Sequence, residues 1–187
     1  MRVIAGQFGS RILRALRGTE LRPTSDRLRE TLFDILGPTV DDSLFVDVFA
    51  GTGAIGIEAL SRRARQVIFI ERHGPAVKLI RENLHSLGIT AGVEVLAIDA
   101  IRGLEQISSR HVLADFIFLD PPYARAADYL RVLEFLDESR LIAPNGIVIA
   151  EHGRKLHLPG RLERLECSRI VEQGDSALSF YRLAMAA

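Results

Sequence analysis

From residue 44 onward, short apolar segments alternate with longer amphipathic ones, and this alternation constrains the fold more than any other feature. The apolar segments have the length of strands, while the segments between them repeat apolar residues at helical spacing. We expect strands near residues 44–49, 66–71, 93–98, 115–120 and 146–151, and helices near 54–63, 74–87, 100–108 and 126–138. Strands joined through helices run parallel, and helices cover both faces of such a sheet. The pattern therefore predicts an α/β fold.

The C-terminal part of the chain has a different pattern. After residue 160, two extended runs are separated by the turn-like QGDS: they are LERLECSRIVE and ALSFYRL. Strands joined by a tight turn pair antiparallel, so we expect this hairpin at one edge of the sheet. The segment HGRKLHLPG before it is too short for a full helix, so the last crossover is expected to be abbreviated.

The first 40 residues precede the alternation and are expected to form an extension. The runs RVIA and RILRAL, joined by QFGS, predict a small β-hairpin. After Pro23, a residue from 24 to 26 can cap a helix that ends at Gly37. Residues 1–30 hold seven Arg and three acidic residues, although the whole chain has zero net charge. A solvated arginine face is the simplest interpretation, and contact with phosphates is the functional one.

Glycines and acidic residues follow the predicted strands just beyond their carboxyl ends, where ligands bind in open α/β sheets. After the first strand comes DVFAGTGAIG, in which Gly51, Gly53 and Gly56 allow close approach of a ligand to the backbone. Glu71 follows the second strand, where a carboxylate can accept both hydroxyls of a ribose. Asp99 ends the third strand, where it can accept a hydrogen bond from the amino group of a purine. Together these residues predict a nucleoside pocket.

The fourth strand ends in the most specific feature of the chain, Asp120, Pro121, Pro122 and Tyr123. Two successive prolines fix φ and remove two backbone N–H groups, so the turn presents carboxylate and carbonyl acceptors. Acceptors that bind both protons of an NH2 group leave the nitrogen pyramidal, with its lone pair directed at an electrophile. Tyr123 offers a flat face on which a base can stack. The quartet therefore predicts chemistry on an exocyclic amine of a nucleobase.

These motifs resemble those of the class I S-adenosylmethionine (SAM) methyltransferases that modify exocyclic amines. The segments LRPTSDRLRETLFDIL and QGDSALSFYR are further similar to the RsmD family, bacterial enzymes that methylate N2 of one guanine in small-subunit (16S) ribosomal RNA. The resemblance covers nearly the whole chain. It implies a Rossmann-like fold whose seven-stranded, mostly parallel sheet has the order 3-2-1-4-5-7-6, with an antiparallel seventh strand. It also implies an RNA-contacting extension at residues 1–40, packed on a methyltransferase domain at residues 41–187.

The resemblance implies a role for each motif. The cofactor is SAM, the product is S-adenosylhomocysteine (SAH), and no metal is needed. The implied catalytic residues are Asp120, Pro121, Pro122 and Tyr123. The residues implied to border the cofactor are Asp47, Phe49, Ala50, Gly51, Thr52, Gly53, Gly56, Glu71, Arg72, Asp99 and Ala100. Those implied to touch the substrate RNA are Arg22, Thr24, Asp26, Arg27 and Arg29.

Three different functions stay open beside this one. A nicotinamide-dependent dehydrogenase also carries G-x-G-x-x-G, but Asp47 would place negative charge near a dinucleotide pyrophosphate, and DPPY has no role in hydride transfer. An enzyme of the same fold that methylates adenine N6 in DNA or RNA would also carry DPPY. An rRNA-binding assembly factor with an idle cofactor belongs to another functional class.

Composition sets the remaining expectations. The 187 residues, of which 48% are hydrophobic, suffice for one ordinary domain with a core. No apolar run has the length of a membrane span and the N-terminus lacks a signal-peptide pattern, so we expect a cytoplasmic protein without a membrane partner. The five histidines lack metal-ligand spacing, and His152 is expected at the surface. The expected partner is the small ribosomal subunit, bound by a monomer.

Overall fold

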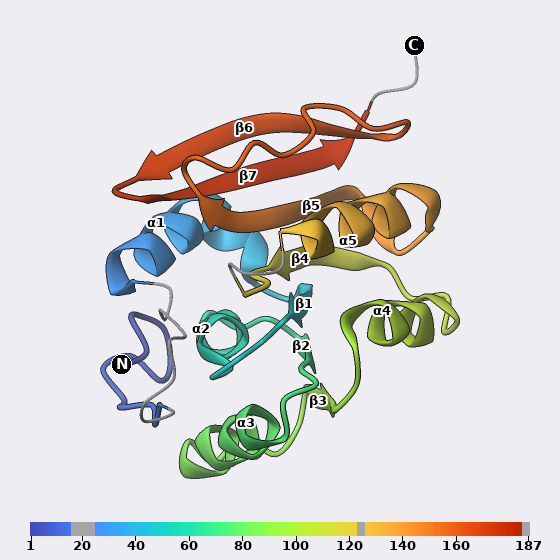
Figure 1. Cartoon of the computed structure of the whole chain (residues 1–187). Helices are drawn as coiled ribbons and strands as arrows, with labels where there is room; N and C mark the ends of the chain where they lie inside the picture. The colour runs from blue at the N-terminus through green and yellow to red at the C-terminus, as the bar shows by residue number, and fades with distance from the viewer. Residues whose placement is uncertain (16–24, 123–125, 185–187) are drawn as a thin grey trace.

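The computed structural model describes residues 1–15, 25–122 and 126–184. The expectations for Arg22, Thr24 and Tyr123 therefore lie outside the described residues. Within them, seven strands form one sheet with the order β3-β2-β1-β4-β5-β7-β6 (Figure 1). Neighbouring strands from β3 to β5 pair in parallel, whereas β7 runs antiparallel to both β5 and β6. This order and the antiparallel seventh strand confirm the expected sheet.

The strands lie close to their expected positions. Their bounds are β1 Leu44–Val48, β2 Gln66–Ile70, β3 Val93–Leu96, β4 Ala114–Leu119, β5 Ile142–Gly153, β6 Leu165–Gln173 and β7 Ser176–Leu183. The start of β5 differs, because Pro144 and Asn145 suggest a turn in the sequence. In the structure these two residues are exposed, and the strand continues past them with a register shift opposite β4. No helix lies between β5 and β6, as expected.

The helices begin and end where local signals predict. Their bounds are α1 Asp26–Leu36, the 3-10 helix η1 Gly37–Val40, α2 Ala54–Ser61, α3 Gly74–Ser86, α4 Ala100–Ser108 and α5 Ala127–Glu138. Ser25 caps α1 by accepting a hydrogen bond from the Leu28 amide, and Asp99 caps α4 by accepting one from the Ile101 amide. Gly37 ends α1 with a φ of 57°, which suits a residue without a Cβ atom.

Helices cover both faces of the sheet (Figure 1). On one face, α1, α2 and α3 pack against strand residues that include Phe45, Phe69 and Phe118. On the other, α4 and α5 pack against alternate residues that include Val46 and Ile117. Side chains alternate between the faces of a strand, so the central strands β1, β2 and β4 are apolar on both sides for most of their length. Polar side chains at the strand ends are therefore the exceptions that need an explanation.

The N-terminal segment, residues 1–15, is a minimal hairpin rather than a pair of regular strands. It forms one isolated antiparallel bridge, between Arg2 and Ile12, and the Leu13 amide donates to the Met1 carbonyl oxygen. Val3 and Leu13 are buried in the same apolar cluster as α1 and α2. The N-terminal segment is thus anchored to the sheet's helical layer, and the division of the chain at residue 40 stays a prediction.

His152 lies in the interior, so the expectation of a surface histidine is wrong. It is 4% exposed, and its ring packs edge-on against the Tyr129 ring of α5, with the two ring centroids 6.3 Å apart. Its Nε2 atom lies 2.8 Å from the Ser179 Oγ atom, and its Nδ1 atom lies 3.0 Å from the Gly153 carbonyl oxygen. Burial lowers the pKa of His152, which favours the neutral ring.

Across residues 1–15, 25–122 and 126–184, no helix combines the length and the apolarity needed to cross a membrane.

Candidate active site

The glycine-rich loop, residues 49–53, joins β1 to α2 in a strained turn. Phe49, Gly51 and Gly53 have positive φ angles of 63°, 54° and 76°. This conformation costs a residue with a Cβ atom about 1–3 kcal/mol, and such strain gathers at ligand sites. A Cβ atom at Gly51 would meet only the Phe49 carbonyl oxygen at 3.9 Å, whereas one at Gly56 would meet the Phe69 ring at 2.3 Å. Gly51 therefore leaves space beside the loop, and Gly56 allows α2 to pack on β2.

Two carboxylates hold the glycine-rich loop and the start of α2. Asp47, on β1, accepts a hydrogen bond from the Gly56 amide at 2.9 Å. Glu71, just after β2, accepts one from the Gly51 amide at 2.9 Å and one from the His73 amide at 2.8 Å. Burial raises the pKa of Asp47 to about 8, and the Glu71 charge adds to this effect. Asp47 therefore holds a proton near neutral pH until a cation approaches it.

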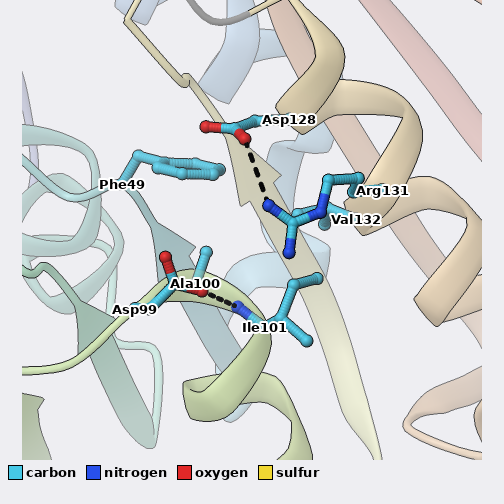
Figure 2. Close-up of a pocket in the computed structure, with 7 residues that line it drawn as sticks. All are labelled: Phe49, Asp99, Ala100, Ile101, Asp128, Arg131 and Val132. Atoms are coloured by element: carbon cyan, nitrogen blue, oxygen red, sulfur yellow. Dashed lines mark hydrogen bonds and ion pairs between the residues drawn. The ribbon is translucent and has the colours of Figure 1, made fainter.

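A pocket opens beside the glycine-rich loop, with about 180 Å³ of empty space including its mouth (Figure 2). Phe49 supplies an aromatic face, and Asp99 supplies a carboxylate that accepts the Ile101 amide at 3.1 Å. The Arg72 guanidinium lies 4.0 Å from the same carboxylate. The residues that line the pocket are Phe49, Asp99, Ala100, Ile101, Asp128, Arg131 and Val132. An aromatic face beside an acceptor is suited to a purine with an amino group.

The far wall of this pocket comes from the first turns of α5, which the sequence did not suggest. Asp128 and Arg131 form an i,i+3 ion pair of 3.7 Å at its mouth (Figure 2). Val132 is buried beneath them. The start of α5 comes shortly after the DPPY quartet in the chain. The only sequence signal for its place in the pocket was the acidic and basic pair in its first turns.

The register of the sheet brings the strand-end carboxylates together. Phe118 on β4 pairs with both Asp47 on β1 and Ile149 on β5. Asp120 and Glu151 lie two residues beyond Phe118 and Ile149, so they project from the same face as Asp47. Glu71 lies two residues beyond the partner of Asp47 on β2. In spatial order, this edge of the sheet carries Glu71, Asp47, Asp120 and Glu151.

The carboxylates of this edge change one another's ionisation. Burial, with the nearby Glu151 and Asp47 charges, raises the pKa of Asp120 well above its usual range. Glu151 is 4% exposed, and its backbone carbonyl accepts the Tyr129 hydroxyl at 2.5 Å. Sequence reasoning missed Glu151, whose only signal was an acidic residue directly after the apolar run Ile147–Ala150. Buried carboxyl groups gathered at this edge favour a cationic ligand, because a nearby positive charge offsets the cost of ionising them.

Among the described residues, no three or more His, Cys, Asp or Glu side chains are arranged to hold a metal ion. The Asp120 carboxylate is partly buried, Pro121 is buried and Pro122 is exposed. The described part of the DPPY quartet thus passes from the interior at Pro121 to the surface at Pro122.

The arginines expected to touch RNA do not share one environment. Arg27 is exposed on α1, whereas the Arg29 side chain is fully buried. Its guanidinium donates to the Asp26 carboxylate at 2.9 Å and to the Arg2 carbonyl oxygen at 2.5 Å, and it lies 4.0 Å from Glu58. The implied contact between Arg29 and RNA is therefore wrong for the side chain as the structure places it. Arg29 joins α1 to the N-terminal segment, and its side chain is out of reach of a phosphate.

The N-terminal segment presents an exposed basic surface beside α3. Arg2, Arg11 and Arg14 are exposed, and Ile12 between them is 81% exposed. The Arg11 guanidinium donates to the Ser86 carbonyl oxygen at 3.2 Å, and that of Arg14 lies 3.1 Å from the Glu82 carboxylate. These side chains are accessible for contact with a polyanion.

Comparisons with known proteins agree with this geometry. The family model described as Conserved hypothetical protein 95 matches residues 1–182. The Bacillus subtilis protein YlbH, described as a candidate rRNA methyltransferase, is 36% identical over 182 residues, covering 97% of this chain and 98% of that protein. The Haemophilus influenzae protein named Ribosomal RNA small subunit methyltransferase D is 35% identical over 153 residues, covering 81% of this chain and 78% of that protein. The chain belongs to the RsmD family.

Solved structures agree with membership of the RsmD family. The Escherichia coli protein yhhF, described as a candidate methyltransferase, superposes with a TM-score of 0.86 at 29% identity, covering 99% of both chains. SMU.776, described as a candidate methyltransferase complexed with SAH, superposes with a TM-score of 0.69 at 13% identity, covering 84% of this chain and 48% of that one. The second likeness shows the fold alone. The class I methyltransferase fold expected from the sequence is confirmed.

Proposed function

We propose that this chain transfers a methyl group from SAM to the exocyclic N2 of a guanine in small-subunit ribosomal RNA. The observation that carries the proposal is the placement of Asp120 on the sheet face that it shares with Asp47, beside the glycine-rich loop. An acceptor for an NH2 group thereby lies next to a loop suited to a nucleoside cofactor. The names of the RsmD relatives support small-subunit rRNA as the substrate.

The residues of the site fit SAM. Asp47 would meet the methionine ammonium group, because a cation offsets the cost of ionising a buried carboxylate. Glu71 would bind the ribose hydroxyls, since each carboxylate oxygen has lone pairs beyond the one that accepts a backbone amide. The adenine would occupy the pocket between Phe49 and Asp99. When bound, SAM supplies an electrophilic methyl group on a sulfonium centre.

The chain's own residues contribute position and charge. Asp120 accepts a proton of the guanine amino group in a hydrogen bond, which directs the nitrogen lone pair toward the methyl group. Holding the reacting atoms in line can recover on the order of 7–11 kcal/mol of the barrier. As positive charge develops on N2, the Asp120 carboxylate stabilises it and then takes the surplus proton toward solvent. The stacking role of Tyr123 remains a prediction.

Access to the substrate follows from the same geometry. A guanine must leave its stack to reach Asp120, so the target should be an unpaired base in the rRNA. The exposed Arg11, Arg14 and Arg27 would contact phosphates, which makes the affinity depend on salt. We further propose that residues 1–40 act as the RNA-contacting extension of a monomeric cytoplasmic enzyme that acts on the small ribosomal subunit.

The test is transfer of labelled methyl from SAM to small ribosomal subunits that lack this modification, beside naked rRNA and DNA. Digestion to nucleosides identifies the product. Label in N2-methylguanosine at one position supports the proposal, and the substrate that is labelled shows the recognised state. If the label were found in N6-methyladenine instead, adenine and not guanine would be the target.

A binding experiment distinguishes a methyltransferase from a dehydrogenase and from an idle assembly factor. SAH should raise the melting temperature of the chain, and a nicotinamide dinucleotide should not. Stabilisation by the dinucleotide alone would favour a dehydrogenase. Stabilisation by SAH without methyl transfer to any substrate would favour the rRNA-binding assembly factor.

A further inference from the structure

A buried asparagine on α3 holds two segments that are distant in sequence. The Oδ1 atom of Asn83 accepts the Arg14 amide at 2.9 Å. Its Nδ2 atom donates to the Arg14 carbonyl oxygen at 3.2 Å and to the Thr52 carbonyl oxygen at 3.2 Å. Asn83 is fully buried, and these three bonds use its acceptor and both of its donors. One side chain thus joins the N-terminal segment to the glycine-rich loop.

The other anchors of the N-terminal segment lie on α2, apart from a weak contact in which the Thr52 hydroxyl of the loop donates to the Met1 Sδ atom at 3.9 Å. Glu58, on α2, accepts the Ile4 amide at 2.7 Å and the Ala5 amide at 3.1 Å. Ser61, at the end of α2, accepts the Phe8 amide at 2.9 Å. These contacts fix the first arm of the hairpin to α2. Asn83 holds the second arm, and it alone among these three anchors bonds to a residue of the loop.

We propose that Asn83 is a positioning residue that couples the N-terminal segment to the cofactor site, so that each stabilises the other. The inference rests on the proposed function, in which the glycine-rich loop binds SAM and the N-terminal segment contacts RNA. If either segment moved away, a buried amide would lose its partner, which is costly in the interior. Such coupling is reciprocal, so cofactor binding stabilises docking of the segment, and docking strengthens cofactor binding.

Hydrogen exchange on the unmodified full-length chain tests the coupling directly. Saturating SAH should slow exchange of the Arg14 amide severalfold, while the Ile170 amide on the distant edge strand β6 serves as the internal reference. Unchanged exchange at Arg14 despite bound SAH would overturn the coupling. Failure of SAH to bind at all would instead overturn the proposed function, so the two failures can be distinguished.

Two substitutions at Arg14 form a matched pair. R14A removes the side chain that pairs with Glu82 but keeps the amide that donates to Asn83. R14P also removes that N–H group. The loss of one buried hydrogen bond should raise the Kd for SAH about threefold to tenfold in R14P. R14A should stay within about twofold of the unmodified chain, and equal SAH affinities in R14A and R14P would contradict the proposal.

Discussion

Asp120, just after β4, lies beside Glu151, near the carboxyl end of β5. The register pairs Leu119 with Ala150, and each acid directly follows one member of that pair. Glu151 is almost completely buried, and its charge contributes to the raised pKa of Asp120. The acceptor that we assign to the guanine amino group is therefore tuned by a neighbour that no motif identifies.

Replacing Glu151 with Gln should shift the acid limb of the methyl-transfer pH profile to lower pH. Without the neighbouring negative charge, the pKa of Asp120 falls, so the catalytic carboxylate ionises at a lower pH. The measurement is the turnover number across a range of pH, with E172Q on the exposed side of β6 as the control. An acid limb in E151Q that matches the one in E172Q would show that Glu151 does not tune Asp120.

Binding of SAH near neutral pH should release most of one proton from Asp47. Its pKa of about 8 means that Asp47 is largely protonated at pH 7, and the ligand's ammonium group favours the ionised form. SAH affinity should therefore rise with pH and level off above about 8. Calorimetry in two buffers of different ionisation enthalpy counts the proton, and D47N should release none. Equal proton release by D47N and the unmodified chain would exclude Asp47 as the source.

The same pKa shift predicts how folding stability depends on pH. A carboxyl group with a raised folded-state pKa binds its proton more tightly in the folded chain. Its contribution is fully present below the unfolded pKa near 4 and is lost as pH rises toward about 8. Urea unfolding should show that the stability of D47N, relative to the unmodified chain, improves over this pH range. If the difference in stability between D47N and the unmodified chain stayed constant over this pH range, Asp47 would not hold a proton more tightly in the folded chain.

Substitutions at Arg29 and at Arg27 should have different effects, the first on folding stability and the second on RNA binding. R29M removes a buried guanidinium from its partners and should lower the free energy of unfolding by about 3 kcal/mol. R27M alters an exposed side chain and should change stability by less than about 0.5 kcal/mol, while it weakens RNA binding and reduces the salt slope. Urea unfolding and RNA titrations at several salt concentrations check both. Equal stability of the two variants would refute the structural role of Arg29.

Much of the fold follows from local sequence signals. Strand length, helical spacing and the turn before β7 depend on residues close together in the chain, so the sheet and its terminal hairpin could be predicted. The positions of Glu71, Asp99 and Asp120 followed from the same reasoning, because strand ends meet at one edge of a parallel sheet, whereas the site role of Asp47 came from the family resemblance. The order of the strands came from the family resemblance and not from the periodicity.

Burial of individual polar residues could not be predicted, because their partners are distant in sequence. Arg29 is indistinguishable from Arg27 in a segment rich in arginine until Glu58 is placed beside it. His152 is buried where Tyr129 of α5 packs against its ring and Ser179 of β7 lies within hydrogen-bond distance of it. Asn83 resembles any polar residue late in an amphipathic helix. For each of these residues, the role becomes clear only from a contact with a residue that is distant in sequence.

The most direct test of the proposed chemistry concerns Asp120. D120A and D120N should lower methyl transfer to small ribosomal subunits by about a hundredfold or more, because the guanine amino group loses its charged acceptor. Both variants should bind SAH within about threefold of the unmodified chain, since the proposed cofactor contacts lie on β1, β2, β3 and their loops. Near-normal turnover in either variant would contradict the assignment of Asp120 as the catalytic carboxylate.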